Sequence, residues 1–351
     1  MKTKMFVMTH KKFDAPTDAL YVPLHVGRAL GNDLGYLGDD TGDNISELNP
    51  YYGELTGLYW LWKNYHDTDI VGICHYRRFF VDEKRELMTK EQLEKALEDV
   101  DVITSNAVTI EMPYKEYYGG AHNIADLMAT GEVIKELYPQ DYPAFCQMIE
   151  GKRHYYGNLC VMRKVQFDAY CEWLFSIFSV LEKRVDLSSY DAYHKRLYGF
   201  LSEGLLMVYI LARGLKVSEG RIAMTAEKAE TVEFKLAMGQ LVKIGQFSEA
   251  RYMFYEYLKL RPDVQLELSD IFREIPDIEL ILFILEKEQE SGQVGFYQVS
   301  KDLKELIKHL RTVRAIIAKE AAGEMIEDVE RQYLVEKNVT DLAKEVIRIN
   351  L

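Results

Sequence analysis

The chain has 351 residues, enough for about two domains that each bury a core of their own. Hydrophobic residues make up 48% and charged residues 28%, which is ordinary for a globular protein and excludes wholesale disorder. The formal net charge of −13 repels phosphate backbones, so we expect no general binding of nucleic acid.

The cysteines and the apolar runs indicate the cellular setting. No two cysteines form a Cys-x-x-Cys pair, so we predict buried reduced thiols rather than zinc ligands or disulfides. The first apolar run, which ends at Met8, is too short for a signal peptide, and no later window approaches the roughly 20 apolar residues that span a bilayer. We therefore expect a cytoplasmic protein that touches the inner face of a membrane only peripherally.

The first part of the chain alternates strand-like and helical patterns. Apolar runs predict buried strands over Lys4–Thr9, Asp69–Cys74 and Val100–Thr104. Asn49-Pro50 predicts the start of a helix over 50–65, because Asn is a good N-cap and Pro is tolerated at the first helical position. Thr89 and Gln92 form a capping-box pattern for a second helix. This alternation predicts an α/β fold with a mixed, mainly parallel sheet flanked by helices.

Between the first two strands lies a long loop, and further elements follow the third. Residues 30–49 hold four glycines and little periodicity, which is typical of a functional loop. Its acidic stretch does not match a calcium-loop spacing and favours a turn. Later patterns predict a strand over Tyr155–Met162, a helix with an apolar face from Phe167 to Leu181, a helix over 199–213 and a strand over Leu215–Ser218.

Beyond Thr225 the pattern becomes purely helical, so we divide the chain into domains 1–225 and 226–351, the second an all-α region. A segment at about 234–262 resembles a tetratricopeptide hairpin. The matching positions are Gly245, Phe247, Ala250, Phe254, Leu258 and Pro262. Only one copy is clear, whereas a free-standing array needs about three, so we expect a helical appendage.

Polar side chains follow the first two predicted strands. Thr9, His10 and Lys11 stand at the carboxyl end of the first strand, where open α/β sheets bind ligands, so they are candidates for a nucleoside and its near phosphate. A solvated strand exit is the alternative. His75, Arg77 and Arg78 directly follow the second strand.

Two adjacent guanidiniums can neutralise a diphosphate without a metal ion. The alternative for Arg77 and Arg78 is a surface ion pair with Asp82 or Glu83. We assign His75, Arg77 and Arg78 to donor binding, on the diphosphate. Taken alone, a histidine such as His75 is more often a hydrogen-bonded structural residue than a ligand.

Two later segments offer groups suited to a sugar and its acceptor. Tyr155, Tyr156 and Asn158 present aromatic faces and an amide, which stack on and hydrogen-bond to a sugar ring, although core packing explains tyrosines equally well. Glu203, near the start of an apolar helix, is a candidate general base, with the helix dipole as the alternative reason for its position. His122 is a second, weaker candidate for catalysis.

Several motifs in one order resemble the bacterial capsular and exopolysaccharide glycosyltransferase-like family, a domain of unknown function, over about residues 4–225. The motifs are THKKFDAP (9–16), GDDTGDNIS (38–46), LNPYYGELTGLYWLWKN (48–64), GICHYRRFF (72–80), YYGNLCVM (155–162) and FLSEGLL (200–206). The resemblance implies a GT-A-like fold, a UDP-sugar donor carrying galactose or galactofuranose, and an acceptor that is a growing polysaccharide or a lipid-linked oligosaccharide.

The resemblance also bears on a metal ion. The segment His75-Tyr76-Arg77 stands where GT-A enzymes carry an Asp-x-Asp metal motif, which puts bound manganese or magnesium in doubt. Carboxylates of Asp39, Asp40 or Asp43 remain candidate ligands for a divalent cation. We also assign Asp40 and Asn44 to donor binding, near the nucleoside.

Two other functions stay open. One is an enzyme that binds a sugar nucleotide and releases phosphate or pyrophosphate; the lack of a P-loop or Rossmann glycine pattern argues against it. The other is a non-catalytic scaffold whose helical region binds other polysaccharide-assembly proteins. The basic stretch Lys308-His309-Arg311-Arg314 suggests contact with a membrane, but a solvated helix face is the favoured interpretation.

Overall fold

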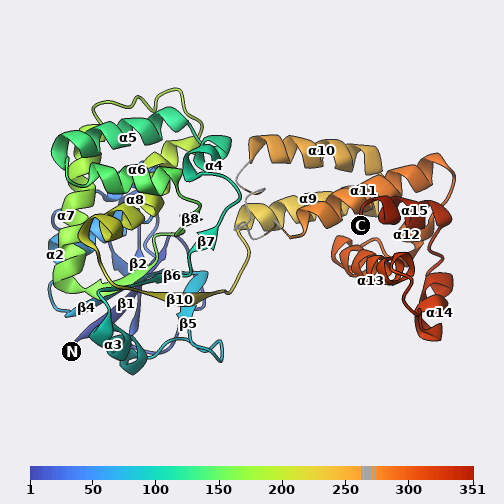
Figure 1. Cartoon of the computed structure of the whole chain (residues 1–351), viewed down its shortest axis with the longest axis horizontal. Helices are drawn as coiled ribbons and strands as arrows, with labels where there is room; N and C mark the ends of the chain where they lie inside the picture. Colours follow the sequence, from blue (N-terminus) through green and yellow to red (C-terminus); the bar gives the residue numbers. More distant parts are fainter. Residues whose placement is uncertain (262–263, 265–270, 272) are drawn as a thin grey trace. The chain divides into compact units, whose positions relative to one another are not determined.

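The computed structural model describes residues 1–261, 264, 271 and 273–351. The described residues form two compact units, Met1–Thr225 and Ala226–Leu351. Each unit has its own apolar core, one built on a sheet and one on helices alone (Figure 1). We describe each unit by itself.

The first unit is built on one eight-stranded sheet in the order β3-β2-β1-β4-β5-β10-β6-β9. The strands are β1 Thr3–Thr9, β2 Tyr21–His25, β3 Leu37–Gly38, β4 Ile70–His75, β5 Arg78–Val81, β6 Val102–Ser105, β9 Cys160–Arg163 and β10 Val217–Met224. Strands β1 to β4 run parallel, but β4 pairs antiparallel with both β5 and β9, which closes a ring of five strands. The sheet is therefore mixed, as the sequence predicts, but its parallel pairings do not outnumber its antiparallel ones.

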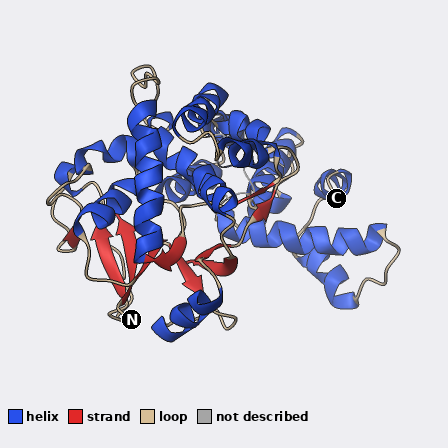
Figure 2. Cartoon of the chain, turned by 60° about the vertical axis from the view of Figure 1, so that its left-hand side comes forward, coloured by secondary structure: helices blue, strands red, loops and turns tan. Residues whose placement is uncertain are grey.

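Helices cover both faces of this sheet (Figure 2). They are α1 Asn49–Tyr52, α2 Leu55–Asn64, α3 Lys90–Asp99, α4 Tyr114–Ala121, α5 Ile124–Leu137, α6 Tyr142–Glu150, α7 Lys164–Leu181 and α8 Leu197–Arg213. Successive β1 side chains point to opposite faces, as a strand requires. Phe6 and Met8 join the core beneath α2 and α4–α8, whereas Met5 and Val7 join the core beneath α3. Strands β1 and β4 are therefore buried between helices on both faces. This packing fixes the polar residues that follow their carboxyl ends.

Two predicted elements of this unit are broken by backbone conformation. The helix predicted over 50–65 is interrupted at Gly53, whose φ of 56° is left-handed. The strand predicted over Tyr155–Met162 begins only at Cys160, because Gly157 and Asn158 have φ of 81° and 52°. A two-stranded ribbon of β7 Val108–Thr109 and β8 Arg153–His154 precedes that turn. The turn matters because it carries three predicted sugar-binding residues.

The second unit is helical throughout the residues that the structure describes. Its helices are α9 Ala229–Lys243, α10 Phe247–Leu260, α11 Ile275–Glu290, α12 Gly295–Val299, α13 Leu303–Ala321, α14 Asp328–Glu336 and α15 Asp341–Ile349. Helices α9 and α10 form a hairpin that turns at Gly245, where φ is 76°, and Ala250 and Phe254 are fully buried. Pro262 lies outside the described residues. The likeness of this hairpin to a tetratricopeptide repeat stays a prediction.

The basic stretch of the second unit is not a uniform solvated face. Arg311 and Arg314 both bind the buried carboxylate of Asp277, at 2.7 and 2.6 Å. His309 is itself buried and hydrogen-bonded to Tyr333. A buried carboxylate needs such cationic partners, so these side chains serve the fold.

The cysteines and helices add two findings. The four thiols are free, and the prediction that they are buried is confirmed for Cys74, Cys160 and Cys171, whereas Cys146 is half-buried. Among the helices of the described part of the chain, none has the length and apolar character that a membrane crossing requires.

Candidate functional site

The site is built where β1, β2 and β4 end side by side. Met8 of β1 lies opposite His75 of β4, and Thr9 lies opposite His25 of β2. The amide of Tyr76 donates to the carbonyl of Met8 at 3.1 Å, so the exit of β4 is fixed against the exit of β1. Parallel strands bring their carboxyl ends to one edge, which places these exits together.

Tyr76 gathers cationic side chains from both exits. The His10 ring meets it edge-on with centroids 5.5 Å apart, the Lys11 ammonium lies 5.1 Å from its centroid, and the Arg77 guanidinium lies 5.2 Å away. Phe13 lies 6.1 Å from the same ring. Cations within about 6 Å of an aromatic face are attracted to it. Three predicted donor-binding residues, His10, Lys11 and Arg77, are thus brought together.

Thr9 serves a different purpose from its neighbours. Its hydroxyl donates to the carbonyl of Lys11 at 2.6 Å and accepts the Lys11 amide at 3.2 Å, and the residue is 1% exposed. A hydroxyl bonded to the backbone two residues on is typical of a turn. Thr9 therefore shapes the loop that presents His10 and Lys11.

Arg78 and Glu203 meet at Gly157. The Glu203 carboxylate accepts the Gly157 amide at 2.9 Å. A Cβ atom at Gly157 would lie 2.8 Å from Nη1 of Arg78, so the guanidinium passes directly over this glycine. The alternative of an ion pair with Asp82 is not seen: the Asp82 carboxylate accepts the amides of its own turn. Within the described residues, Arg78 forms no ion pair.

His75 lies between positive and negative groups. Burial lowers the pKa of His75 to about 4, helped by Arg78, Arg77 and Arg196, although Glu54 opposes the shift. The imidazole is therefore neutral at pH 7, so His75 can offer a diphosphate a hydrogen bond but not a positive charge. Its Nε2 is buried and has no hydrogen-bond partner among the described residues.

Glu54 and Arg196 are site residues that the sequence reasoning missed. Burial alone raises the pKa of Glu54, but His75, Arg196 and a hydrogen bond from Asn158 outweigh it, so the pKa lies below its usual value. Arg196 reaches this place from the residue before α8, with Nη2 3.7 Å from a Cβ built at Gly53. Glu54 lies inside the motif over 48–64, and this was the one feature of the sequence that could have indicated Glu54 as a site residue.

Asn158 is a structural anchor of the site. Its amide donates to Glu54 at 2.7 Å and to the Gly199 carbonyl at 3.2 Å, and its oxygen accepts the Ser202 hydroxyl at 2.9 Å. The residue is 4% exposed, and all of these contacts use the side-chain amide. Asn158 thus joins α2 to α8, and the expectation that its amide faces a sugar is not supported by this geometry.

The tyrosines before this turn differ from each other. Tyr155 is 5% exposed and its hydroxyl donates to Glu219 at 3.4 Å, so it belongs to the core. Tyr156 is half-buried and lies edge-on to His154, with centroids 4.7 Å apart. Burial, then Tyr117 and more distantly Glu203, raise the pKa of Tyr156 above its usual value. Tyr156 is the member of the pair nearer to Glu203.

His122 lies on the α8 side of the site. Its ring stacks on Phe200, with centroids 4.3 Å apart, and contacts Tyr193 and Tyr118 at 5.8 and 4.8 Å. Phe200 precedes Glu203 by three residues, and residues three apart lie on one face of a helix. His122 and Glu203 are therefore on the same side of α8.

The acidic loop does not act as one cluster. Asp39 is fully buried, and its oxygens accept the amides of Gly27 and Arg28 and the hydroxyl of Ser46. Asp43 instead accepts the Tyr59 hydroxyl at 3.0 Å. No trio of His, Cys, Asp or Glu side chains is placed to hold a metal ion in the part of the chain that the structure describes.

The other two loop residues, Asp40 and Asn44, have different roles: one can bind a ligand and the other fixes a turn. Asp40 has Oδ2 3.6 Å from Arg28, while its buried Oδ1 has no partner among the described residues. Asn44 accepts the Ser46 amide at 3.2 Å and donates to the Gly42 carbonyl at 3.0 Å, which fixes the turn. Of the two predicted nucleoside contacts, Asp40 keeps an acceptor for a ligand and Asn44 does not.

Comparisons with known proteins agree with the span of this unit. Residues 4–214 match a family described as Domain of unknown function (DUF4422). The solved apo structure of WbbM, described as a bifunctional glycosyltransferase, is 32% identical, with a TM-score of 0.58. The match covers 65% of this chain and 46% of that one, so this chain spans less than half of that protein's length. No match to a curated protein was found.

Proposed function

The chain belongs to the family described as Domain of unknown function (DUF4422), and we propose that it is a glycosyltransferase that uses a nucleotide-sugar donor. We infer a UDP-linked galactose or galactofuranose as donor. The acceptor is a growing capsular polysaccharide, an exopolysaccharide or a lipid-linked oligosaccharide. The likeness to the WbbM glycosyltransferase structure supports transfer of a glycosyl group.

The aromatic cluster at the β1 exit supports binding of a nucleoside. Phe13 lies between Tyr76 and Tyr36, with ring centroids 6.1 and 5.9 Å away. Lys12 lies over Tyr36 at 4.7 Å, as Lys11 lies over Tyr76. A flat base stacks on such rings, and the lysines favour the phosphate that follows it.

One observation carries the proposal: Arg78 and Glu203 meet at Gly157. A departing nucleoside diphosphate gains negative charge, which Arg77 and Arg78 neutralise. The Glu203 carboxylate, which accepts the Gly157 amide, takes the proton of the attacking acceptor hydroxyl. His75 contributes a neutral hydrogen bond through Nε2. A cation for the leaving group and a base for the nucleophile are thus held by one turn.

The acidic loop does not fit a resident divalent cation, because both Asp39 oxygens are bound to the fold, Asp43 lies with Tyr59, and Asp40 offers a single oxygen without a partner among the described residues. We derive no step through manganese or magnesium. Running each donor assay with and without Mn²⁺ tests whether the activity depends on a divalent cation.

The test measures release of UDP from UDP-galactose and UDP-galactofuranose. We expect slow donor hydrolysis by the wild-type chain and a loss of about 10²-fold or more in Arg78→Ala, since removing one group that stabilises charge in the transition state typically costs that much. Arg221→Ala is the matched control, because Arg221 is an exposed arginine of β10, in the same sheet. Full activity of Arg78→Ala with intact folding would contradict the proposal and favour the scaffold alternative.

A further inference from the structure

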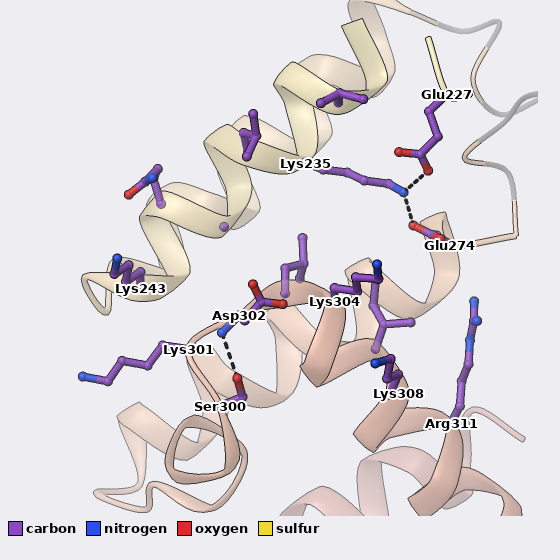
Figure 3. A pocket seen from close by; sticks show the side chains of 16 residues that line it. Glu227, Lys235, Lys243, Glu274, Ser300, Lys301, Asp302, Lys304, Lys308 and Arg311 are labelled. Atoms are coloured by element: carbon purple, nitrogen blue, oxygen red, sulfur yellow. Dashed lines mark hydrogen bonds and ion pairs between the residues drawn. The ribbon is translucent and has the colours of Figure 1, made fainter. Parts of the chain in front are cut away.

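The second unit has a groove that the proposed function does not use. It measures about 810 Å³ and lies between α9 and the start of α13 (Figure 3). All of its lining residues belong to Ala226–Leu351. We call it the α9–α13 groove.

One wall of the groove is an exposed apolar stripe. Val232, Leu236 and Gly239 recur three or four residues apart along α9, so they share one helical face. Val232 is 40% and Leu236 61% exposed. A Cβ built at Gly239 meets no atom within 4 Å, so the space above this helix is open. Apolar residues left exposed in a groove indicate a binding surface.

The other wall is cationic. Lys235 is already held between Glu227 and Glu274, as Figure 3 shows, and Arg311 binds Asp277. In contrast, Lys301 and Lys304 have no carboxylate partner within the described residues. In a chain with a net charge of −13, this local positive charge favours an acidic ligand.

The same chain carries a segment that complements the groove. Residues 324–336 include five carboxylates and one arginine. Met325, Val329 and Val335 in this segment are 87%, 66% and 79% exposed. Glu330 binds Lys319 and caps α14 with Glu327, but Glu324 and Asp328 are exposed. The segment is therefore acidic and apolar, and part of it forms helix α14.

The segment of one copy does not reach the groove of the same copy. The groove lies at the first turns of α13, and residues 324–336 follow its last turn. Helix α13 has 19 residues, which at about 1.5 Å each separates its ends by about 28 Å. Contact therefore requires two molecules. Because groove and segment are different surfaces, two copies either exchange segments reciprocally in a closed dimer or continue head-to-tail beyond a dimer.

We propose that residues 324–336 of one copy dock in the α9–α13 groove of a second copy. A segment that places exposed apolar side chains in an apolar groove with charges at its rim follows a recurrent mode of recognition. The surface is small by the standard of stable complexes, so association is weak and depends on concentration. It also weakens with salt, because exposed charges are screened.

Sedimentation velocity between about 10 and 500 µM tests the proposal, with concentrations chosen for weak binding. We expect the mean mass of the wild-type chain to rise above that of a monomer in 50 mM salt and to fall toward a monomer in 500 mM salt, as screening requires. The variants K301E/K304E and E324K/D328K each stay monomeric alone. Their equimolar mixture associates again, because each supplies the charge that the other has lost. Lys95→Glu, at an exposed site on α3, is the control and associates like the wild type.

A second pair of variants separates specific docking from general charge attraction. Gly239→Trp fills the open space over α9 and abolishes association, whereas Gly239→Ala leaves it unchanged. A labelled peptide of residues 324–336 binds the wild-type chain but not Gly239→Trp. A chain that stays monomeric at the highest concentration, or a mixture that fails to associate, overturns the proposal. So does a groove that binds a polygalacturonate oligosaccharide in preference to the peptide, because its occupant is then an anionic glycan.

Discussion

His75 illustrates how single residues in the site depend on one another. Three arginines lie near it, and burial together with those arginines keeps its imidazole neutral, with a pKa of about 4. Glu54 is the countercharge that limits this shift, and Asn158 holds Glu54 in place at 2.7 Å. The site thus contains two carboxylates, Glu54 and Glu203, with different surroundings. Their roles are separable by substitution.

We expect Glu203→Gln to lower kcat by about 10²-fold or more, as loss of a general base typically does. A glutamine oxygen still accepts the Gly157 amide, so the hydrogen bond to the turn is preserved. The measurement is the pH profile of kcat, whose acidic limb disappears in the variant. An unchanged profile would show that Glu203 only holds the turn.

Glu54→Gln is the matched comparison and has a different expected outcome. The glutamine oxygen still accepts from Asn158, but the negative charge beside His75 and Arg196 is lost. Because Glu54 raises the pKa of His75, the variant lowers that pKa further below about 4. NMR titration of the His75 ring measures this pKa directly. An unchanged His75 pKa would contradict the assigned proximity, whatever happens to activity.

Among the elements, the turn after β8 decides the geometry of the site. Gly157 has a φ of 81°, and any side chain there meets Arg78. We expect Gly157→Ala to cost about 1–2 kcal/mol of stability from backbone strain and also to displace Arg78, with loss of activity. Gly214→Ala is the control: Gly214 also has a left-handed φ, of 59°, but a Cβ there meets nothing within 4 Å. Thermal melts should be similar for both variants, while only Gly157→Ala loses UDP release.

The elements also show what the sequence predicts well. The cores of β1 and β4 and the capping box of α3 follow from local patterns and are confirmed. Adjacent parallel strands must end at one edge, so the meeting of His10 and Lys11 with Arg77 was predictable. Glu54 and Arg196 were not, because they precede helices whose positions depend on packing. Asp39 looked like a ligand because its buried amide partners leave no trace in the sequence.

At the scale of the whole molecule, buried histidines couple stability to pH in both units. His154 is fully buried against Tyr114 in the first unit, and burial lowers its pKa to about 3. His309 is 3% exposed in the second unit, and burial, helped by Lys337, lowers its pKa to about 4. Once the chain unfolds, both imidazoles have the ordinary histidine pKa of about 6.5. All three tryptophans, Trp60, Trp62 and Trp173, lie in the first unit, so their fluorescence reports on that unit alone.

We expect stability to fall as the pH drops from about 6.5 toward 4, because in that window the unfolded chain binds protons that the buried histidines of the folded chain do not. Above about pH 6.5 the contribution of neutral His309 to the free energy of unfolding is fully present. By pH 4 about 3 kcal/mol of this free energy is lost. His309→Gln removes this part of the pH dependence of stability, since glutamine does not titrate and still hydrogen-bonds to Tyr333.

Urea unfolding at pH 5 and 7.5 checks this prediction. Far-UV circular dichroism, which reports on both units, should show a smaller effect of pH on stability in the variant. Tryptophan fluorescence should show the wild-type pH effect, whereas His154→Phe should reduce it. An equal pH dependence of the circular dichroism transition in His309→Gln and the wild type would mean that His309 is protonated in the folded chain.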